Sequence, residues 1–322
     1  MTQLGLEIAE QGTLLGATLL ASQGSQLQAA AALVRAASVV RFVGIGSSRH
    51  VAGYAAECFD ALAGVPTSVL AAPGAAVPLP RFGPGQLVVV VSQSGQTPAL
   101  LTVASAARSA GATVLALTNT VGSPLEDAAD AALQAGAGLE RVVPATKSVT
   151  AMMLLLRVLA GPVDLTAVTL LTSTIGRLVH DEGGWLASVA ATADLPQIVV
   201  SGGVAGQWVA DEVALKLAEI VGHLAAAESL VDFLHGPAAV PAPVLAFLDP
   251  DDPNAAEVSR RVDVVTVGPG PECVVPLSPT GDRWLDAIAQ VVAGQCLALH
   301  WAQARGVDPD DARGLAKVTL TR

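Results

Sequence analysis

Two stretches of this sequence combine glycine with closely spaced hydroxyl side chains. Gly44-Ile45-Gly46-Ser47-Ser48 follows the β-branched run 39–43, and Ser92-Gln93-Ser94-Gly95-Gln96-Thr97 follows the apolar run 87–91. An apolar run, a polar turn and a helical stretch predict a strand, a loop and a helix. Free N–H groups at a helix N-terminus and added hydroxyl donors suit an anion without requiring cationic side chains. Two such loops side by side would form a cradle for a phosphate.

Each loop also has an ordinary structural interpretation. Ser47, Ser48 and Thr97 could be helix N-caps, which stabilise a helix by about 1 kcal/mol each. Neither loop is a dinucleotide-binding fingerprint, because Gly44-Ile45-Gly46 lacks the third glycine, and no P-loop lysine follows. The presence of two loops in one predicted sheet favours the phosphate interpretation, since ligands of parallel sheets lie beyond the carboxyl ends of the strands.

The elements that would position these loops alternate between strand and helix. Strands are predicted at 39–43, 87–91, 113–118 and 131–134, with helices at 51–63, 99–110 and 147–159. This alternation predicts an α/β fold, a mostly parallel sheet with helices on both faces.

The second half of the chain repeats the pattern. Strands are predicted at 197–200, 244–248 and 262–267, with helices at 165–191, 207–227 and 284–305. We therefore predict an internal duplication, with domains at 1–162 and 163–322. The second-half loop at 248–253 contains three aspartates and would repel phosphate, so one anion site is expected per chain.

Composition excludes several classes of protein. The chain has 322 residues, of which 52% are hydrophobic, and a net charge of −11. Prolines and glycines interrupt its long uncharged stretches, so no membrane span is predicted. An acidic chain with few aromatic residues is a poor nucleic-acid binder. The three cysteines are far apart and the N-terminus lacks a signal peptide, so we expect a cytoplasmic protein without metal or cofactor.

The motifs together resemble a known family. FVGIGSSRHVAG at 42–53 and VVVVSQSGQTPALL at 88–101 resemble the sugar isomerase (SIS) domain. ALKLAEI at 214–220, FLHGP at 233–237 and RGLAKVT at 313–319 extend the similarity to the isomerase part of glucosamine-6-phosphate synthase. The resemblance implies two tandem SIS domains, each a three-layer α/β/α structure.

The resemblance also implies roles for individual residues. Glu219 matches the glutamate that moves a proton between the first two sugar carbons, and Lys317 the lysine that forms a Schiff base with the open-chain ketose. His235 matches the ring-opening histidine, which in the synthase reaches in from the neighbouring subunit. The implied sugar-phosphate contacts are Ser47, Ser48, Ser92, Gln93, Ser94 and Thr97.

These residue types suit aldose–ketose chemistry, in which a carboxylate carries the proton and a neutral amine attacks the carbonyl. Taken singly, each has another interpretation. Glu219 could pair with Lys216 on a helix surface, Lys317 could be a solvated chain-end residue, and His235 could be an ordinary loop histidine. Their shared order with the serine loops favours the catalytic interpretation.

The reaction is inferred from what the sequence lacks. It begins Met1-Thr2-Gln3, without the nucleophilic cysteine that opens the glutaminase domain of the synthase. We therefore expect a deaminase or isomerase that converts glucosamine 6-phosphate into fructose 6-phosphate and ammonia. A fructosamine-6-phosphate deglycase and a non-catalytic phosphosugar-binding regulator are the alternatives. A small-molecule sugar phosphate and a second copy of the chain, in a homodimer with a shared site, are the expected partners.

Overall fold

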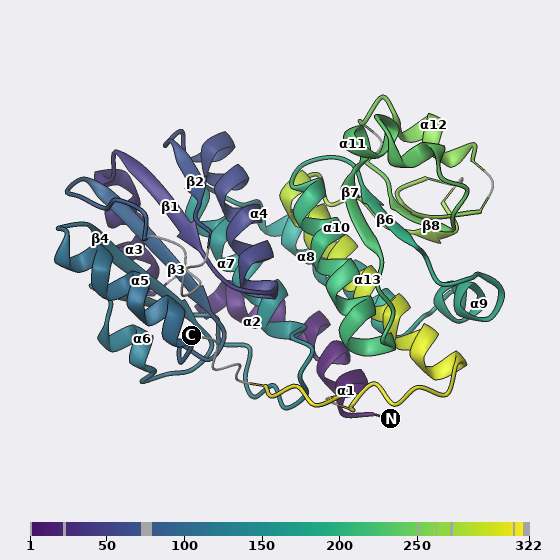
Figure 1. The fold of residues 1–322 in the computed structure, drawn as a ribbon, viewed down its shortest axis with the longest axis horizontal. Coiled ribbons are helices and arrows are strands. Elements are labelled where there is room, and N and C mark those ends of the chain that lie inside the picture. Colours follow the sequence, from purple (N-terminus) through teal and green to yellow (C-terminus); the bar gives the residue numbers. More distant parts are fainter. Residues whose placement is uncertain are drawn as a thin grey trace. The chain divides into compact units, whose positions relative to one another are not determined.

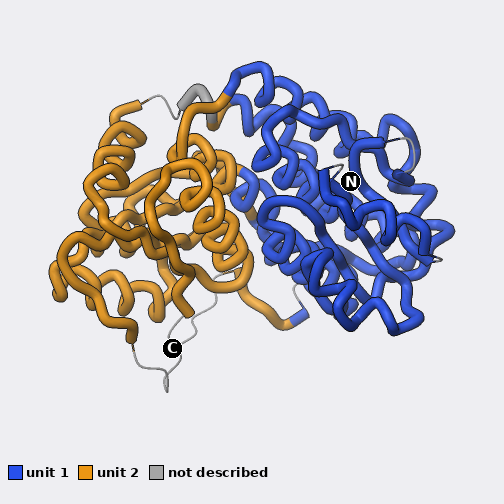
Figure 2. The backbone as a smooth tube through the Cα atoms, turned by 90° about the horizontal axis from the view of Figure 1, so that it is seen from above, with its two compact units in different colours: residues 1–16, 141–150, 164–313 blue, residues 17–140, 151–163, 314–322 orange. Residues whose placement is uncertain are grey.

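A computed structural model describes residues 2–21, 24–71, 79–249, 251–261, 263–270, 273–311 and 313–317. They form two compact units, coloured separately in Figure 2. Unit 1 comprises residues 1–16, 141–150 and 164–313, and unit 2 comprises residues 17–140, 151–163 and 314–322. The predicted domain boundary between residues 162 and 163 stays a prediction, because the two units are defined by contacts in space and each contains several separate segments of the chain.

Unit 2 contains a five-stranded parallel sheet in the order β2-β1-β3-β4-β5. Its strands are β1 (Val39–Val43), β2 (Thr67–Val69), β3 (Gln86–Ser92), β4 (Thr113–Thr118) and β5 (Ala131–Gln134). Its helices are α3 (Ser25–Ala36), α4 (Ser47–Leu62), α5 (Pro98–Ser109) and α6 (Pro124–Asp127). Two further helices, α2 (Gln11–Ala21) and α7 (Lys147–Ala160), contribute residues to both units.

Unit 1 contains a second parallel sheet in the order β10-β9-β8-β6-β7. Its strands are β6 (Ile198–Ser201), β7 (Ala226–Ser229), β8 (Val244–Phe247), β9 (Val264–Gly268) and β10 (Val275–Pro276). Its helices are α1 (Gln3–Ala9), α8 (Leu165–Val179), α9 (Trp185–Thr192), α10 (Gly206–Lys216), α11 (Leu230–Leu234), α12 (Ala255–Ser259) and α13 (Arg283–Ala304). Both sheets follow one strand order, second-first-third-fourth-fifth, so the predicted α/β fold with two similar halves is confirmed (Figure 1).

The central strands are apolar because helices cover both of their faces. Val88 and Val90 of β3 pack with residues of α5, whereas Val89 and Val91 point to the opposite face and are equally buried. This continuous burial, typical of parallel sheets, explains the apolar composition. Among the described residues, no helix has the combined length and hydropathy that crossing a bilayer requires.

Two predicted helices are shorter than expected. The helix at 165–191 is interrupted between α8 and α9, where Asp181 and Gly184 both adopt positive φ and the Asp181 carboxylate accepts from the backbone N–H groups of Leu186 and Ala187. The helix at 207–227 ends in a π-helical turn, and strand β7 begins at Ala226. In the predicted strand 262–267, Val262 lies outside the described residues.

Candidate functional site

The first hydroxyl loop turns sharply from β1 into α4. A Cβ atom on Gly44 would lie 2.2 Å from the Ser48 carbonyl oxygen, and Gly46 has a φ of +59°, so both positions require glycine. The N-cap of α4 is Gly46. Ser47 and Ser48 are therefore the first two helical residues, and the N-cap interpretation of these two serines is wrong.

The second hydroxyl loop, between β3 and α5, is held by its own side chains. The buried Ser92 hydroxyl accepts from the Gly95 N–H at 3.1 Å, and the Ser94 hydroxyl accepts from the Gln96 N–H at 3.3 Å. Thr97 occupies the N-cap of α5, but its side chain makes no capping hydrogen bond. The Thr97 hydroxyl therefore does not cap the helix.

The two loops leave neighbouring strands of one sheet. β1 and β3 pair in parallel, with Val43 opposite Val90, so both chains turn at the same edge of the sheet. In the strand order of unit 2, this is the point at which the chain direction across the sheet reverses, where α/β sheets bind ligands. The structure therefore brings together the hydroxyl loops whose sequences predicted the phosphate cradle.

Glu219 lies in the π-helical turn η1 (Leu217–Val221), directly after α10. Its carboxylate pairs with the ammonium of Lys216, whose side chain is fully buried. The Lys216 Nζ also lies 3.5 Å from a carboxylate oxygen of the buried Glu212. Glu219 keeps 18% of its side-chain surface accessible, so one of the two carboxylates around Lys216 faces outward. The surface-pair interpretation is wrong, because the lysine is part of the core.

A second contact supports the π-helical turn. The guanidinium of Arg313 donates to the carbonyl oxygens of Glu219 at 2.8 Å and Ile220 at 3.0 Å. These carbonyls lie at the end of the helix, which terminates at Gly222 in the left-handed conformation. π-Helical turns recur at functional sites because the extra residue displaces side chains from the regular helical array. Arg313 and Lys216 thus hold Glu219 from its backbone and its side chain.

His235 and Lys317 have different surroundings. His235 is the exposed C-cap residue of α11 in unit 1. Lys317 belongs to unit 2, where its Nζ lies 3.2 Å from Glu140 Oε2. The Glu140 side chain is fully buried and that of Lys317 is 21% exposed. Lys317 is therefore anchored to the interior of unit 2, and its interpretation as a solvated chain-end residue is wrong.

Four residues around the predicted site were missed by sequence reasoning as functional: Glu140, Glu212, Lys216 and Arg313. The (i, i+4) and (i, i+3) spacings around Lys216 could have suggested a charge cluster. Nothing local in the sequence signals the pairing of Glu140 with Lys317. Within the described ranges, no group of three or more His, Cys, Asp and Glu side chains could hold a metal ion.

Comparisons with known proteins identify what this chain is similar to. Residues 33–161 match the SIS domain model. The isomerizing glutamine–fructose-6-phosphate aminotransferase of Aeropyrum pernix is 33% identical over 320 residues, which cover 89% of this chain and 52% of the relative. The chain thus spans about half the length of this relative. The predicted resemblance to a SIS domain and to the isomerase part of the aminotransferase is confirmed.

Solved structures share the whole fold. A Silicibacter pomeroyi protein, provisionally named a phosphosugar isomerase, is 27% identical with a TM-score of 0.79, covering 96% of this chain and 100% of that one. A glucosamine-6-phosphate deaminase from Thermotoga maritima is 21% identical with a TM-score of 0.79, covering 99% and 100%. The second similarity concerns the fold alone. Each of these two structures aligns with both halves of this chain.

Proposed function

From the premise that residues 33–161 form a SIS domain, we propose that this chain is an aminosugar-phosphate deaminase or isomerase. The proposed reaction converts glucosamine 6-phosphate and water into fructose 6-phosphate and ammonia. The observation that carries the proposal is the pair of hydroxyl loops at adjacent ends of β1 and β3. They offer hydroxyls and helical N–H groups to a phosphate, so an acidic chain can still bind an anionic sugar.

In the proposed mechanism, the six loop residues hold the phosphate of the sugar. His235 transfers the proton that opens the sugar ring. Glu219 then removes the proton from C2 and returns it to C1, while a second proton moves from the amine nitrogen to O1, which converts the aldose into a C2 imine. The Lys317 ammonium passes a proton to Glu140, and its amine adds to the imine carbon and expels ammonia, which leaves a Schiff base between Lys317 and C2. Water then adds to this Schiff base and releases the ketose phosphate and the lysine amine.

The surroundings of Glu219 support its role as the base. Lys216 is fully buried and pairs with Glu219, so the carboxylate is fixed in direction while it remains partly accessible. A base fixed in this way loses little conformational entropy when substrate binds. Glu212 offers a second partner to the same lysine, so a proton gained by Glu219 would not leave the Lys216 charge unpaired.

A substrate panel tests the proposal and separates it from its alternatives. Purified protein is incubated with glucosamine 6-phosphate, with a fructosamine-6-phosphate adduct of an amino acid, and with unphosphorylated glucosamine. Ammonia from the first substrate alone is the expected result. Release of a free amino acid from the adduct alone would instead identify a deglycase. Binding of both phosphorylated sugars without turnover would identify a regulator and overturn the enzymatic proposal.

A further inference from the structure

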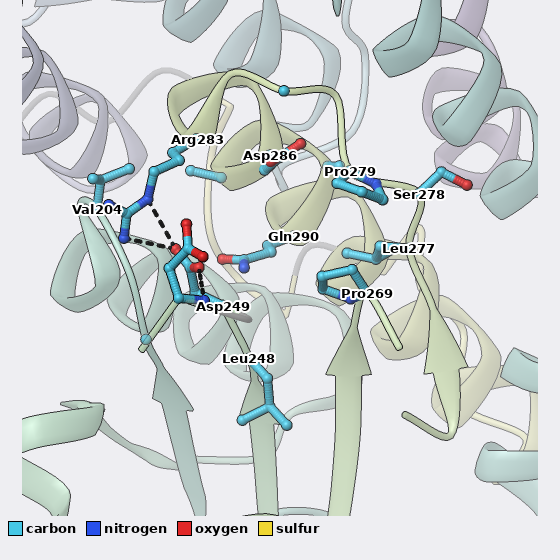
Figure 3. Close-up of a pocket in the computed structure, with 15 residues that line it drawn as sticks. Val204, Leu248, Asp249, Pro269, Leu277, Ser278, Pro279, Arg283, Asp286 and Gln290 are labelled. Carbon is cyan, nitrogen blue, oxygen red and sulfur yellow. Dashed lines mark hydrogen bonds and ion pairs between the residues drawn. The ribbon is translucent and has the colours of Figure 1, made fainter. Parts of the chain in front are cut away.

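A cavity of about 280 Å³ lies in unit 1, at the carboxyl edge of the second sheet. Residues that follow β6, β8, β9 and β10 line it together with the first turns of α13 (Figure 3). β6 and β8 are the counterparts of β1 and β3 in the shared strand order. The cavity therefore occupies, in the second half, the place that the phosphate cradle is proposed to occupy in the first.

The charges in this cavity have the opposite sign from those that a phosphate requires. Three carboxylates, Asp249, Asp251 and Asp286, and one guanidinium, Arg283, line it. Asp249 is already paired with Arg283 at 3.0 Å (Figure 3). Asp251 and Asp286 thus remain as net negative charge. Desolvation by burial raises the pKa of Asp286, against the hydrogen bonds from Thr280 that lower it, so a nearby cation would stabilise its ionised form.

A buried amide is the second observation that points to a ligand. Gln290 is only 6% exposed, and its side chain points from α13 towards Asp249 (Figure 3). Its amide oxygen accepts from the Ser201 hydroxyl at 3.3 Å. Among the described residues, no acceptor for its Nε2 group is found. An amide N–H that lines a cavity and meets no protein acceptor is available to donate to a ligand oxygen there, so this group suits such a ligand.

We propose that this cavity binds a phosphate-free, amine-bearing molecule of monosaccharide size, such as an unphosphorylated aminosugar. Its ammonium lies against Asp251 and Asp286, and one of its hydroxyl oxygens accepts from Gln290. The apolar walls formed by Val204, Leu248, Leu277, Pro269 and Pro279 cover the carbon skeleton. A volume of about 280 Å³ lies at the lower end of the range for ligand pockets, which suits a molecule of monosaccharide size.

The proposal is independent of the enzymatic function. It concerns residues of unit 1 alone, whereas the proposed phosphate cradle belongs to unit 2. The duplication has thus produced two sites at corresponding positions, in which hydroxyls and N–H groups serve an anion and carboxylates serve a cation. The same cavity rejects inorganic phosphate, because two carboxylates remain without a cationic partner in the cavity lining.

Calorimetric titration of the full chain tests this site in an amine-free buffer. The probes are glucosamine, glucose, N-acetylglucosamine and inorganic phosphate, which separate the ammonium from the sugar hydroxyls. We expect glucosamine to bind at least about tenfold more tightly than glucose or N-acetylglucosamine, as a charge-assisted contact implies. Equal affinity for glucose, or no glucosamine binding, would overturn the proposal.

Variants locate the binding. Asp251→Asn and Asp286→Asn remove the charges with little change of shape, and together they should lower glucosamine affinity at least about tenfold. Asp251 is exposed, so its single variant keeps the test valid should the double variant fail to fold. Glu257→Gln, on the exposed surface of α12, is the matched control and should bind normally.

Ser94→Ala distinguishes the two sites. Glucosamine binding should survive this substitution in the second hydroxyl loop. Loss of binding in Ser94→Ala, with retention in the aspartate variants, would place glucosamine at the proposed catalytic site and overturn the second site. Retained glucosamine binding by a protein that releases no ammonia from glucosamine 6-phosphate would contradict the enzymatic proposal alone.

Discussion

The ammonium of Lys317 lies 3.2 Å from Glu140 Oε2, a partner 177 positions earlier in the chain. The carboxylate is fully buried, whereas the lysine remains 21% exposed. An uncompensated buried carboxylate is costly, so Glu140 attracts the Lys317 amine to one place in unit 2. For a lysine close to the chain end, such an anchor replaces conformational freedom with a defined position.

Glu140→Gln should therefore impair the proposed reaction by releasing Lys317 from its position. The amide cannot hold the ammonium as the carboxylate does, and we expect kcat for ammonia release to fall at least about tenfold. KM for the phosphosugar should change little, because the hydroxyl loops are untouched. Asp60→Asn, at an exposed position of α4, is the matched control. Steady-state kinetics with unchanged kcat would contradict the positioning role.

Glu219→Gln tests the proposed base. The amide retains the size of the side chain but cannot accept the C2 proton, so ammonia release should fall about 100-fold or more. Binding of the sugar phosphate, measured by calorimetry, should persist because the phosphate contacts lie elsewhere. Thermal unfolding checks that the fold survives the lost pairing with Lys216. A variant that folds normally and retains full turnover would exclude Glu219 as the base.

Two substitutions in the second hydroxyl loop should separate binding from stability. Thr97→Val removes a hydroxyl that makes no capping hydrogen bond, so KM should rise about tenfold with no change in Tm. Ser92→Ala removes the acceptor of the Gly95 N–H and should also lower the free energy of unfolding by about 1 kcal/mol. An unchanged KM in both variants would argue against a phosphate site here.

A shared active site predicts recovery of activity in mixed dimers. His235→Ala and Lys317→Ala proteins should each be inactive alone. If His235 of one copy serves the site of the other, co-refolded mixtures should contain dimers with one intact site. We expect up to about a quarter of the wild-type activity for random pairing. Inactive mixtures whose subunit exchange is verified by mass spectrometry would count against the shared site.

The cysteines should be unreactive in the native state. Cys58, Cys273 and Cys296 form no disulfide and are buried, and desolvation by burial raises the pKa of Cys296 to about 12. A thiol with a raised pKa stays protonated at pH 8, and the protonated form is a poor nucleophile. A thiol-specific dye should label all three cysteines in denaturant and none on the same time scale in the folded protein. Rapid native labelling would contradict this burial.

Much of the fold was predictable from local sequence patterns. The runs 39–43 and 113–118 coincide with β1 and β4, because runs rich in β-branched and apolar residues bounded by turn residues are typical of buried strands. The run 131–134 coincides with β5, although it contains no β-branched residue. The glycine and serine turns likewise predicted where each strand ends. Local patterns did not predict the break at 180–184. There Asp181 adopts a positive φ, and its carboxylate accepts from two backbone N–H groups in the first turn of α9.

The sequence by itself determined the strand–loop–helix repeats and the residue types that could bind a sugar phosphate. Only the tertiary structure decided the partners of those residues. The spacing of three residues between Lys216 and Glu219 predicts that they can pair. It does not predict that the lysine is buried in the core. The contact between Glu140 and Lys317 and the acidic cavity beyond β6 and β8 join distant segments. Folding brings such distant residues together. The free energy of a charged side chain then depends on its burial and on its partners in space, which local sequence does not specify.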